Sequence, residues 1–149
     1  MEIKKILWPT DVSENAALAM PLVQSLSEKY QAEVHVLYVI EGMGPFGAWY
    51  GDFDRAHAEK IQQMEREAAE RELEEICSQN LQGCPLYIRH IAVGEPAGEI
   101  LKIVEREKMD LVVMASRGRR GRFLFGSVTE RVVKHCPVPV LTVPVPEKK

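Results

Sequence analysis

The sequence has few cysteines, and their spacing does not match a metal site. The three cysteines are an odd number without a C-x-x-C pair, and they stand at Cys77, Cys84 and Cys136. Such a set is typical of unpaired thiols in a reducing compartment, although Cys77 and Cys84 could in principle pair. We therefore expect no metal site and a cytoplasmic protein.

Long apolar runs and a large excess of one charge are also missing. No apolar segment approaches the roughly 20 residues that a membrane-spanning helix needs. The apolar run before Pro9 is too short for the core of a signal peptide. The net charge of −3 gives no general attraction to nucleic acid or to an anionic membrane. We expect neither of these as a partner, and we expect the chain to remain in the cytoplasm.

Arrangements typical of catalysis are absent as well. The sequence contains no Ser/His/Asp, Cys/His or H-E-x-x-H pattern, and its histidines are separated single residues, namely His35, His57, His90 and His135. We interpret each of them as a core or surface residue. The expectation is a protein that is not an enzyme.

The residues that are present alternate between short apolar segments and amphipathic segments. The apolar segments predict strands at 3–8, 34–40, 86–93, 111–115 and 138–143. The amphipathic segments predict helices at 13–31, 53–80, 96–108 and 127–135. This order predicts one α/β domain over residues 1–149, a doubly wound five-stranded parallel sheet with helices on both faces.

Three details of this prediction can be tested directly. Pro9 is expected to end the first strand, because proline has no backbone N–H. The long helix is expected to bury Ile61, Met64, Ala68, Leu73 and Ile76. Residues 144–149 are expected to form a frayed tail.

Candidate binding residues follow from the position of each strand end. In a doubly wound sheet, ligands bind at the carboxyl ends of the strands, here residues 9–11, 39–41 and 115–127. The last segment contains glycines and leads into a helix, whose N-terminal amides can hold a phosphate. Alternatively, the glycines only permit turns. Ser127 and Glu130 are expected to form a capping box, which does not exclude phosphate binding.

These segments together resemble the universal stress protein family. Nucleotide-binding members carry G-x2-G-x9-G-[ST] between the fourth strand and the last helix. The resemblance covers nearly the whole chain and is carried by residues 6–13, 93–96, 112–114, 126–132 and 137–141. Two positions depart from the motif: Ala115 replaces its first glycine, and seven residues (119–125) replace nine.

The resemblance implies a Rossmann-like fold of the adenine nucleotide alpha hydrolase type. It implies ATP or AMP as ligand, with or without Mg²⁺. The residues expected to face the adenosine are Pro9, Thr10, Asp11 and Val39, and those expected to face the phosphates are Ala115, Gly118, Gly126, Ser127 and Val128. Because the loop is two residues shorter, a triphosphate, a monophosphate and no nucleotide all remain open.

The chemistry of three side chains agrees with this assignment. Asp11 can accept hydrogen bonds from ribose hydroxyls or hold a metal on the phosphates, although it is equally suited to a turn. Ser127 can donate to a phosphate oxygen. Arg117 is the best phosphate candidate among the four arginines of the loop; the alternative is that these arginines form a solvated surface.

The resemblance and the pattern of the last strand also predict a homodimer. Strand 138–143 is expected at a sheet edge, where Pro139 is tolerated, and antiparallel pairing with a second copy would cover it. The alternative is a monomer whose edge is guarded by Pro139, Pro144 and Pro146. A family member without nucleotide, acting as a dimeric interaction module, is therefore the second functional hypothesis.

A glycine- and aromatic-rich segment at 41–52 predicts a loop beside the nucleotide. Residues 42–47 match G-x-G-x-x-G, but Pro45 removes a donor and no helix follows directly. We therefore expect no dinucleotide site in this loop.

Overall fold

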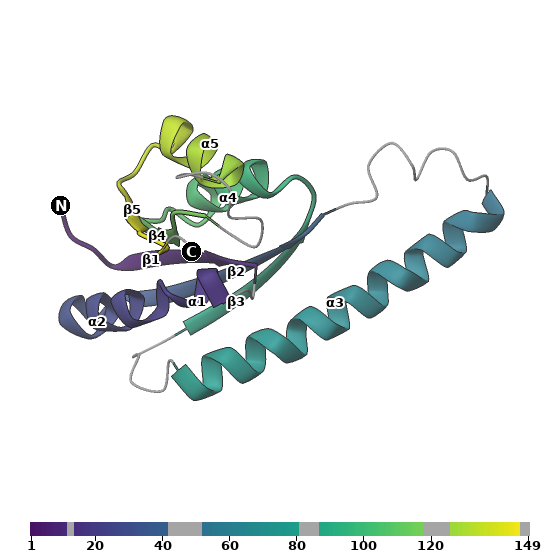
Figure 1. Ribbon diagram of the computed structural model, residues 1–149, viewed down its shortest axis with the longest axis horizontal. Helices are drawn as coiled ribbons and strands as arrows, with labels where there is room; N and C mark the ends of the chain where they lie inside the picture. The colour runs from purple at the N-terminus through teal and green to yellow at the C-terminus, as the bar shows by residue number, and fades with distance from the viewer. Residues whose placement is uncertain (12–13, 42–51, 81–86, 118–125, 147–149) are drawn as a thin grey trace.

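The computed structural model describes residues 1–11, 14–41, 52–80, 87–117 and 126–146 of the chain. Its strands form one parallel sheet in the order β3-β2-β1-β4-β5 (Figure 1). Their bounds are β1 Lys5–Thr10, β2 Glu33–Ile40, β3 Tyr87–Val93, β4 Leu111–Ala115 and β5 Val140–Val143. The helices are α1 Glu14–Ala17, α2 Met20–Tyr30, α3 Asp52–Asn80, α4 Pro96–Arg106 and α5 Ser127–His135. The predicted α/β fold class is confirmed.

Helices cover both faces of the sheet (Figure 1). Even-numbered residues of β1 and β2 pack with α2 and with Leu73 of α3. Leu7 and Leu37 instead pack with α4 and α5. This division follows from the alternation of side chains along a strand, and it leaves the middle of β1 buried from both sides.

The first strand extends further than the sequence predicted. We expected Pro9 to end it, but Pro9 lies inside β1 and pairs with Leu37 of β2. The prediction was wrong because β1 pairs with β4 only at Ile6 and Leu7, so the ladder with β4 has already ended before the proline.

The first helical segment was predicted as one helix over residues 13–31 but contains two. Leu18 lies between α1 and α2 and is 44% exposed. Pro21 stands in the first turn of α2, where its missing N–H costs no helical hydrogen bond. A single helix would have placed this proline in its interior, so a second helix begins at Met20.

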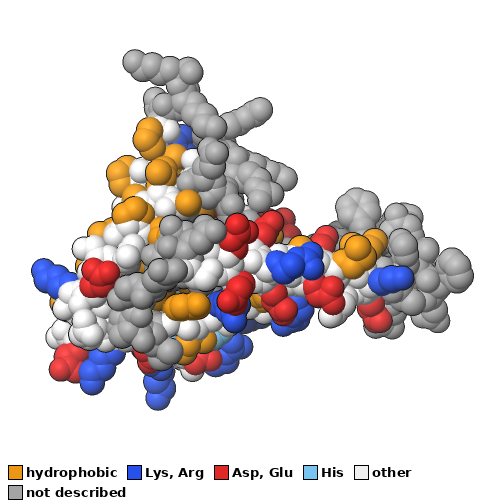
Figure 2. Space-filling model, turned by 90° about the horizontal axis from the view of Figure 1, so that it is seen from below, with side chains coloured by type: hydrophobic (Ala, Val, Ile, Leu, Met, Phe, Trp, Pro, Cys, Tyr) orange, Lys and Arg blue, Asp and Glu red, His pale blue; other side chains and the backbone are white. Residues whose placement is uncertain are grey.

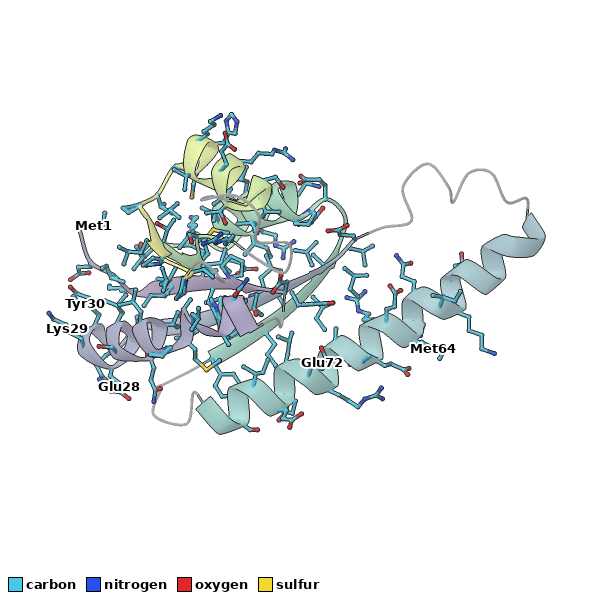
Figure 3. All side chains as sticks on the ribbon, in the orientation of Figure 1. Met1, Glu28, Lys29, Tyr30, Met64 and Glu72 are labelled. Carbon is cyan, nitrogen blue, oxygen red and sulfur yellow. The ribbon has the colours of Figure 1, made fainter. Side chains whose placement is uncertain are left out.

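The long helix α3 packs on the sheet through its second half only. Ala69 and Leu73 are buried, whereas Ile61 is 38% and Met64 is 61% exposed, which contradicts the prediction that both lie inside. The half that carries Met64 extends beyond the sheet, so no strand lies beneath it (Figures 1 and 3). Acidic and basic side chains are interspersed on the extended part of the molecule (Figure 2). No helix in the described part of the chain combines the length and apolar character needed to cross a membrane.

The C-terminal strand lies at a sheet edge, as predicted, but is shorter than expected. It begins at Val140, and the carbonyl of the preceding Pro139 accepts a hydrogen bond from Val112 N at 3.0 Å. The prediction of a frayed tail was wrong for Val145, which is only 9% exposed. The contacts that hold Val145 are described with the site below.

The start of α4 is fixed by the side chain of Glu95. Its two carboxylate oxygens accept hydrogen bonds from Ala97 N at 3.1 Å and Gly98 N at 2.7 Å. Arg131 of α5 contacts the same carboxylate at 2.7 Å and so links the two helices. Partial burial acts to raise the pKa of Glu95, but the two amides and Arg131 together lower it below 4.5.

We predict that Glu95→Ala lowers the free energy of unfolding by about 1 kcal/mol, because the first turn of α4 loses its cap. Chemical denaturation at neutral pH measures this change. Glu105→Ala is the matched control, since Glu105 is an exposed residue of the same helix away from its cap. Equal stability of the two variants would show that the cap contributes nothing.

Candidate functional site

The candidate site lies where β1 and β4 separate. β1 remains paired with β2 as far as Thr10, whereas its pairing with β4 ends at Leu7 and Val112. The chain leaves the two strands toward opposite faces, to α1 and α2 after β1 and to α5 after β4. This is the arrangement in which doubly wound sheets bind ligands.

The residues expected to face adenosine lie at adjacent ends of β1 and β2. Thr10 is buried at 7% exposure, and Pro9 and Asp11 are half-buried. Thr10 pairs with Tyr38, so Val39 lies one position further toward the same edge. Because the Val39 side chain packs against the core beneath α4, its main chain is the part suited to meet a ligand.

The residues expected to face phosphates are brought together by two hydrogen bonds. Gly126 N donates to Ser116 O at 2.9 Å, and Thr129 Oγ1 donates to Ala115 O at 3.0 Å. These bonds hold the first turn of α5, which includes Ser127 and Val128, against the end of β4. Ala115 does not have a positive φ angle, so its methyl group is compatible with the backbone.

The predicted capping box of α5 is not formed. Gly126 is the N-cap, in an extended conformation with φ −67° and ψ 155°, and no side chain caps the helix. Ser127 is already the first helical residue, so it does not hold the N-cap position that a capping box requires. Glu130 instead pairs with Lys134 at 2.9 Å, one turn further on.

Arg117, the candidate phosphate ligand of the loop, is turned toward the C-terminal tail. It is 7% exposed, and its Nη2 donates to Val145 O at 2.7 Å. Gly118 and the rest of the loop to 125 lie outside the described residues, as do most of the 41–52 loop and Cys84. A role for Arg117 at a phosphate therefore stays a prediction.

The comparison with known protein families agrees with this geometry. The profile of the family described as "Universal stress protein family" matches residues 2–144, nearly the whole chain. The chain belongs to the universal stress protein family. The earlier resemblance is thereby confirmed.

Two curated relatives come from Methanocaldococcus jannaschii. Universal stress protein MJ0531 is 31% identical, with 98% of this chain and 85% of the relative covered. Universal stress protein MJ0577 is 32% identical, with 94% of each chain covered. The solved structure of MJ0577 superposes with a TM-score of 0.86 over 99% of this chain and 100% of that chain.

Universal stress proteins solved with nucleotides share the fold at lower identity. The Arabidopsis thaliana member with AMP bound is 18% identical, covering 94% of this chain and 90% of that one, with a TM-score of 0.66. The Archaeoglobus fulgidus member in complex with dAMP is 18% identical, covering 94% and 96%, with a TM-score of 0.63. At this identity the likeness establishes the fold of the present universal stress protein.

A separate surface hollow of about 300 Å³ lies between α3 and β3. Arg66 donates to Ile91 O at 3.4 Å, and Arg89 pairs with Glu74. Both arginines are thus engaged by groups of the protein itself. The hollow lies on the α3 face of β3, so it does not belong to the site between β1 and β4.

Two histidines that are far apart in the sequence, His35 and His90, lie in contact. His35 Nδ1 and His90 Nε2 are 2.9 Å apart, and the rings stack with centroids separated by 5.2 Å. The parallel register between β2 and β3 could have revealed this pair, because His90 lies opposite Leu37, two residues from His35 on the same face.

Among the described residues no three potential metal ligands cluster, so the expectation of no metal site stays a prediction.

Electrostatics assigns the proton between the two rings. His35 Nε2 lies 3.6 Å from Glu33 Oε1, so a proton on Nε2 faces a carboxylate. His35 Nδ1 is then the acceptor, and His90 Nε2–H is the donor. Desolvation lowers the pKa of His35 below 6.5, opposed by Glu33 and Glu107 and reinforced by Lys5. Desolvation also lowers the pKa of His90, with His35 and Arg106 acting in the same direction and Glu107 opposing them.

We predict that the protein loses stability as the pH falls below about 6.5. In that range the unfolded chain binds more protons than the folded chain, because both folded-state pKa values are depressed, so stability decreases with decreasing pH. Unfolding curves between pH 5 and 8 measure the slope.

His90→Gln should reduce this slope, because an amide can still donate to His35 but does not titrate. His135→Gln is the control, since His135 is an exposed residue of α5. An unchanged slope in His90→Gln would assign the acid sensitivity to other groups.

Proposed function

We propose that this universal stress protein binds an adenine nucleotide, ATP or AMP, with or without Mg²⁺, in a regulatory role in the stress response. The observation that carries the proposal is the attachment of α5 to the end of β4, beside the separating β1. The N-terminal amides and the dipole of α5 are thereby directed to the edge of the sheet where a phosphate would lie. AMP and dAMP bound by members with the same fold support this choice of ligand.

In this proposal the base and ribose lie over the ends of β1 and β2. Asp11 accepts from ribose hydroxyls, and the main chain after Val39 borders the base. The phosphates meet Gly126, Ser127 and the loop that begins at Gly118. In this proposal the protein acts by binding, not as an enzyme: the contacting histidines His35 and His90 lie within β2 and β3, whereas the candidate site lies at the carboxyl ends of the strands.

One observation favours the second candidate, a dimeric interaction module without nucleotide. Arg117 is engaged by the tail, and the loop that follows is two residues shorter than the family motif. If the phosphate contact is missing, the dimer surface is the part of the molecule that carries the function. The two candidates are separated by the binding experiment below.

We propose a cytoplasmic location for either function. The described cysteine Cys136 is unpaired, and burial raises the pKa of its thiol, which makes it less reactive. An unreactive, unpaired thiol is compatible with a reducing compartment.

We predict that ATP or AMP raises the unfolding temperature of the parent protein. A ligand at 100 times its Kd adds about 2.7 kcal/mol to the free energy of unfolding. Gly126→Val should abolish this shift, because a branched side chain would occupy the phosphate position. The extended backbone at Gly126 accepts any residue, so the variant should still fold.

Val133→Ala is the control, because Val133 is exposed on the same helix and lies away from its N-terminus. If Gly126→Val binds as tightly as the parent, the nucleotide lies elsewhere. If neither nucleotide changes the unfolding temperature of the parent, with or without Mg²⁺, the result favours the interaction module.

We also propose a homodimer formed by β5. Pro139 O and Val143 O accept hydrogen bonds from β4, so backbone groups of alternate residues, Val140 and Thr142, face away from the sheet. Leu141 adds an apolar side chain that is 41% exposed. Antiparallel pairing with a second copy would satisfy the outward groups and close the assembly.

We predict that Thr142→Pro yields a folded monomer, whereas the parent sediments as a dimer at micromolar concentration. The proline removes an outward N–H and leaves the ladder with β4 intact. Leu141→Pro serves as the contrast, because its N–H faces β4 and its loss should also destabilise the fold. A monomeric parent would rule out this dimer.

A further inference from the structure

The C-terminal segment is attached to the exit of β4 by three hydrogen bonds. Ser116 N donates to Val143 O at 2.8 Å, Val145 N donates to Ser116 Oγ at 3.2 Å, and Arg117 Nη2 donates to Val145 O at 2.7 Å. Ser116, Arg117 and Val145 are each at least nine-tenths buried. The segment after β5 is therefore an ordered part of the edge at which the candidate site lies.

Ser116 joins this segment to the start of α5. Its N–H binds the end of β5 and its hydroxyl oxygen binds the tail at Val145, while its carbonyl accepts from Gly126 N at 2.9 Å. The neighbouring Ala115 O accepts from Thr129 Oγ1. One residue thus connects the tail on one side with the N-cap of the proposed phosphate-binding helix on the other.

Burial makes this connection stiff. A guanidinium withdrawn from water needs hydrogen-bond partners, and the carbonyl of Val145 is one of them. Losing the tail would expose Ser116 and Arg117 to water and leave the backbone at this position with fewer constraints. Gly126 and the first turn of α5 would keep their bonds to Ser116 O and Ala115 O, but the tail would no longer hold Ser116 in place.

We propose that residues 144–146 form a positioning segment for the nucleotide site, acting through Ser116 and Arg117 without touching the ligand. The proposal rests on the proposed nucleotide binding. The segment fixes the positions of Ser116 and Arg117 and, through the bond from Gly126 N to Ser116 O, the place where α5 begins. Binding at the site therefore depends on contacts made on the far side of β4, next to the sheet edge.

Two matched truncations test the proposal. A chain ending at Val143 lacks Val145, whereas a chain ending at Pro146 keeps every contact described above. We expect the first to bind ATP or AMP about tenfold more weakly than the parent and the second to bind like the parent. Calorimetric titration measures Kd at a temperature at which all three chains are fully folded, and sedimentation shows whether the dimer is retained.

Point variants keep the test valid if the shorter chain does not fold. Ser116→Ala removes the acceptor for Val145 N and should weaken binding, whereas Ser116→Thr keeps a hydroxyl and should restore it. A purely structural role would lower thermal stability without changing the Kd of the folded protein. Parent-like affinity in both the Val143-terminated chain and Ser116→Ala would overturn the proposal.

Amide hydrogen exchange separates this proposal from nucleotide binding itself. Without any ligand, the Gly126 amide should exchange faster in Ser116→Ala and in the chain ending at Val143 than in the parent. If the parent binds no nucleotide, the proposed function fails, and this measurement still decides whether the tail positions α5. Unchanged exchange at Gly126 would refute the coupling.

Discussion

The fold depends on the burial of β1 from both sides. Ile6, Leu7 and Trp8 are consecutive and completely buried, so their side chains point alternately to opposite faces and both faces need a cover of helices. α2 and α3 supply one layer, and α4 and α5 supply the other. The pairing of β1 also creates the place where β1 and β4 separate, because β1 pairs with β2 over six residues and with β4 over only two.

The same constraint explains why the candidate site is built from main-chain groups. The strands carry apolar side chains at their carboxyl ends, such as Val39 and Ala115, and these pack into the core or against the neighbouring helix. The polar groups at this edge include peptide groups, the side chains of Thr10 and Asp11 and the first turn of α5. Such a set is suited to binding and orienting a nucleotide, since it offers both hydrogen-bond donors and acceptors.

Local patterns predicted the sheet and most helix boundaries because burial and periodicity are encoded in neighbouring residues. β4 and α5 begin and end where the sequence placed them. The errors arose where a distant element decides the outcome. Pro9 is tolerated inside β1 because of where β4 stops pairing, and Met64 is exposed because the sheet does not reach that part of α3.

The candidate site was likewise predicted in part: local patterns located its residues, but contacts between distant residues were missed. The strand-end rule placed the candidate residues on neighbouring strands, but it could not indicate that Arg117 turns to Val145 or that His35 meets His90. Both contacts join residues far apart in sequence, and each depends on the register of two strands. The capping box failed for a smaller reason, since a shift of one residue made Gly126 the N-cap.

The last strand connects the two surfaces to which we assign functions. Its outward backbone groups, at Val140 and Thr142, form the proposed dimer edge, and its inward groups pair with β4. The chain continues from this strand to Val145, which is hydrogen-bonded to Ser116 and Arg117 directly after β4. If the proposed dimer contact changed the position of β5, it would therefore act on the proposed nucleotide site through Ser116. Thermodynamic linkage then requires that nucleotide binding change the dimer affinity by the same factor. A short segment is sufficient for the proposed coupling, because the outward groups of β5 and the contacts of Val145 are separated by only a few residues of the chain.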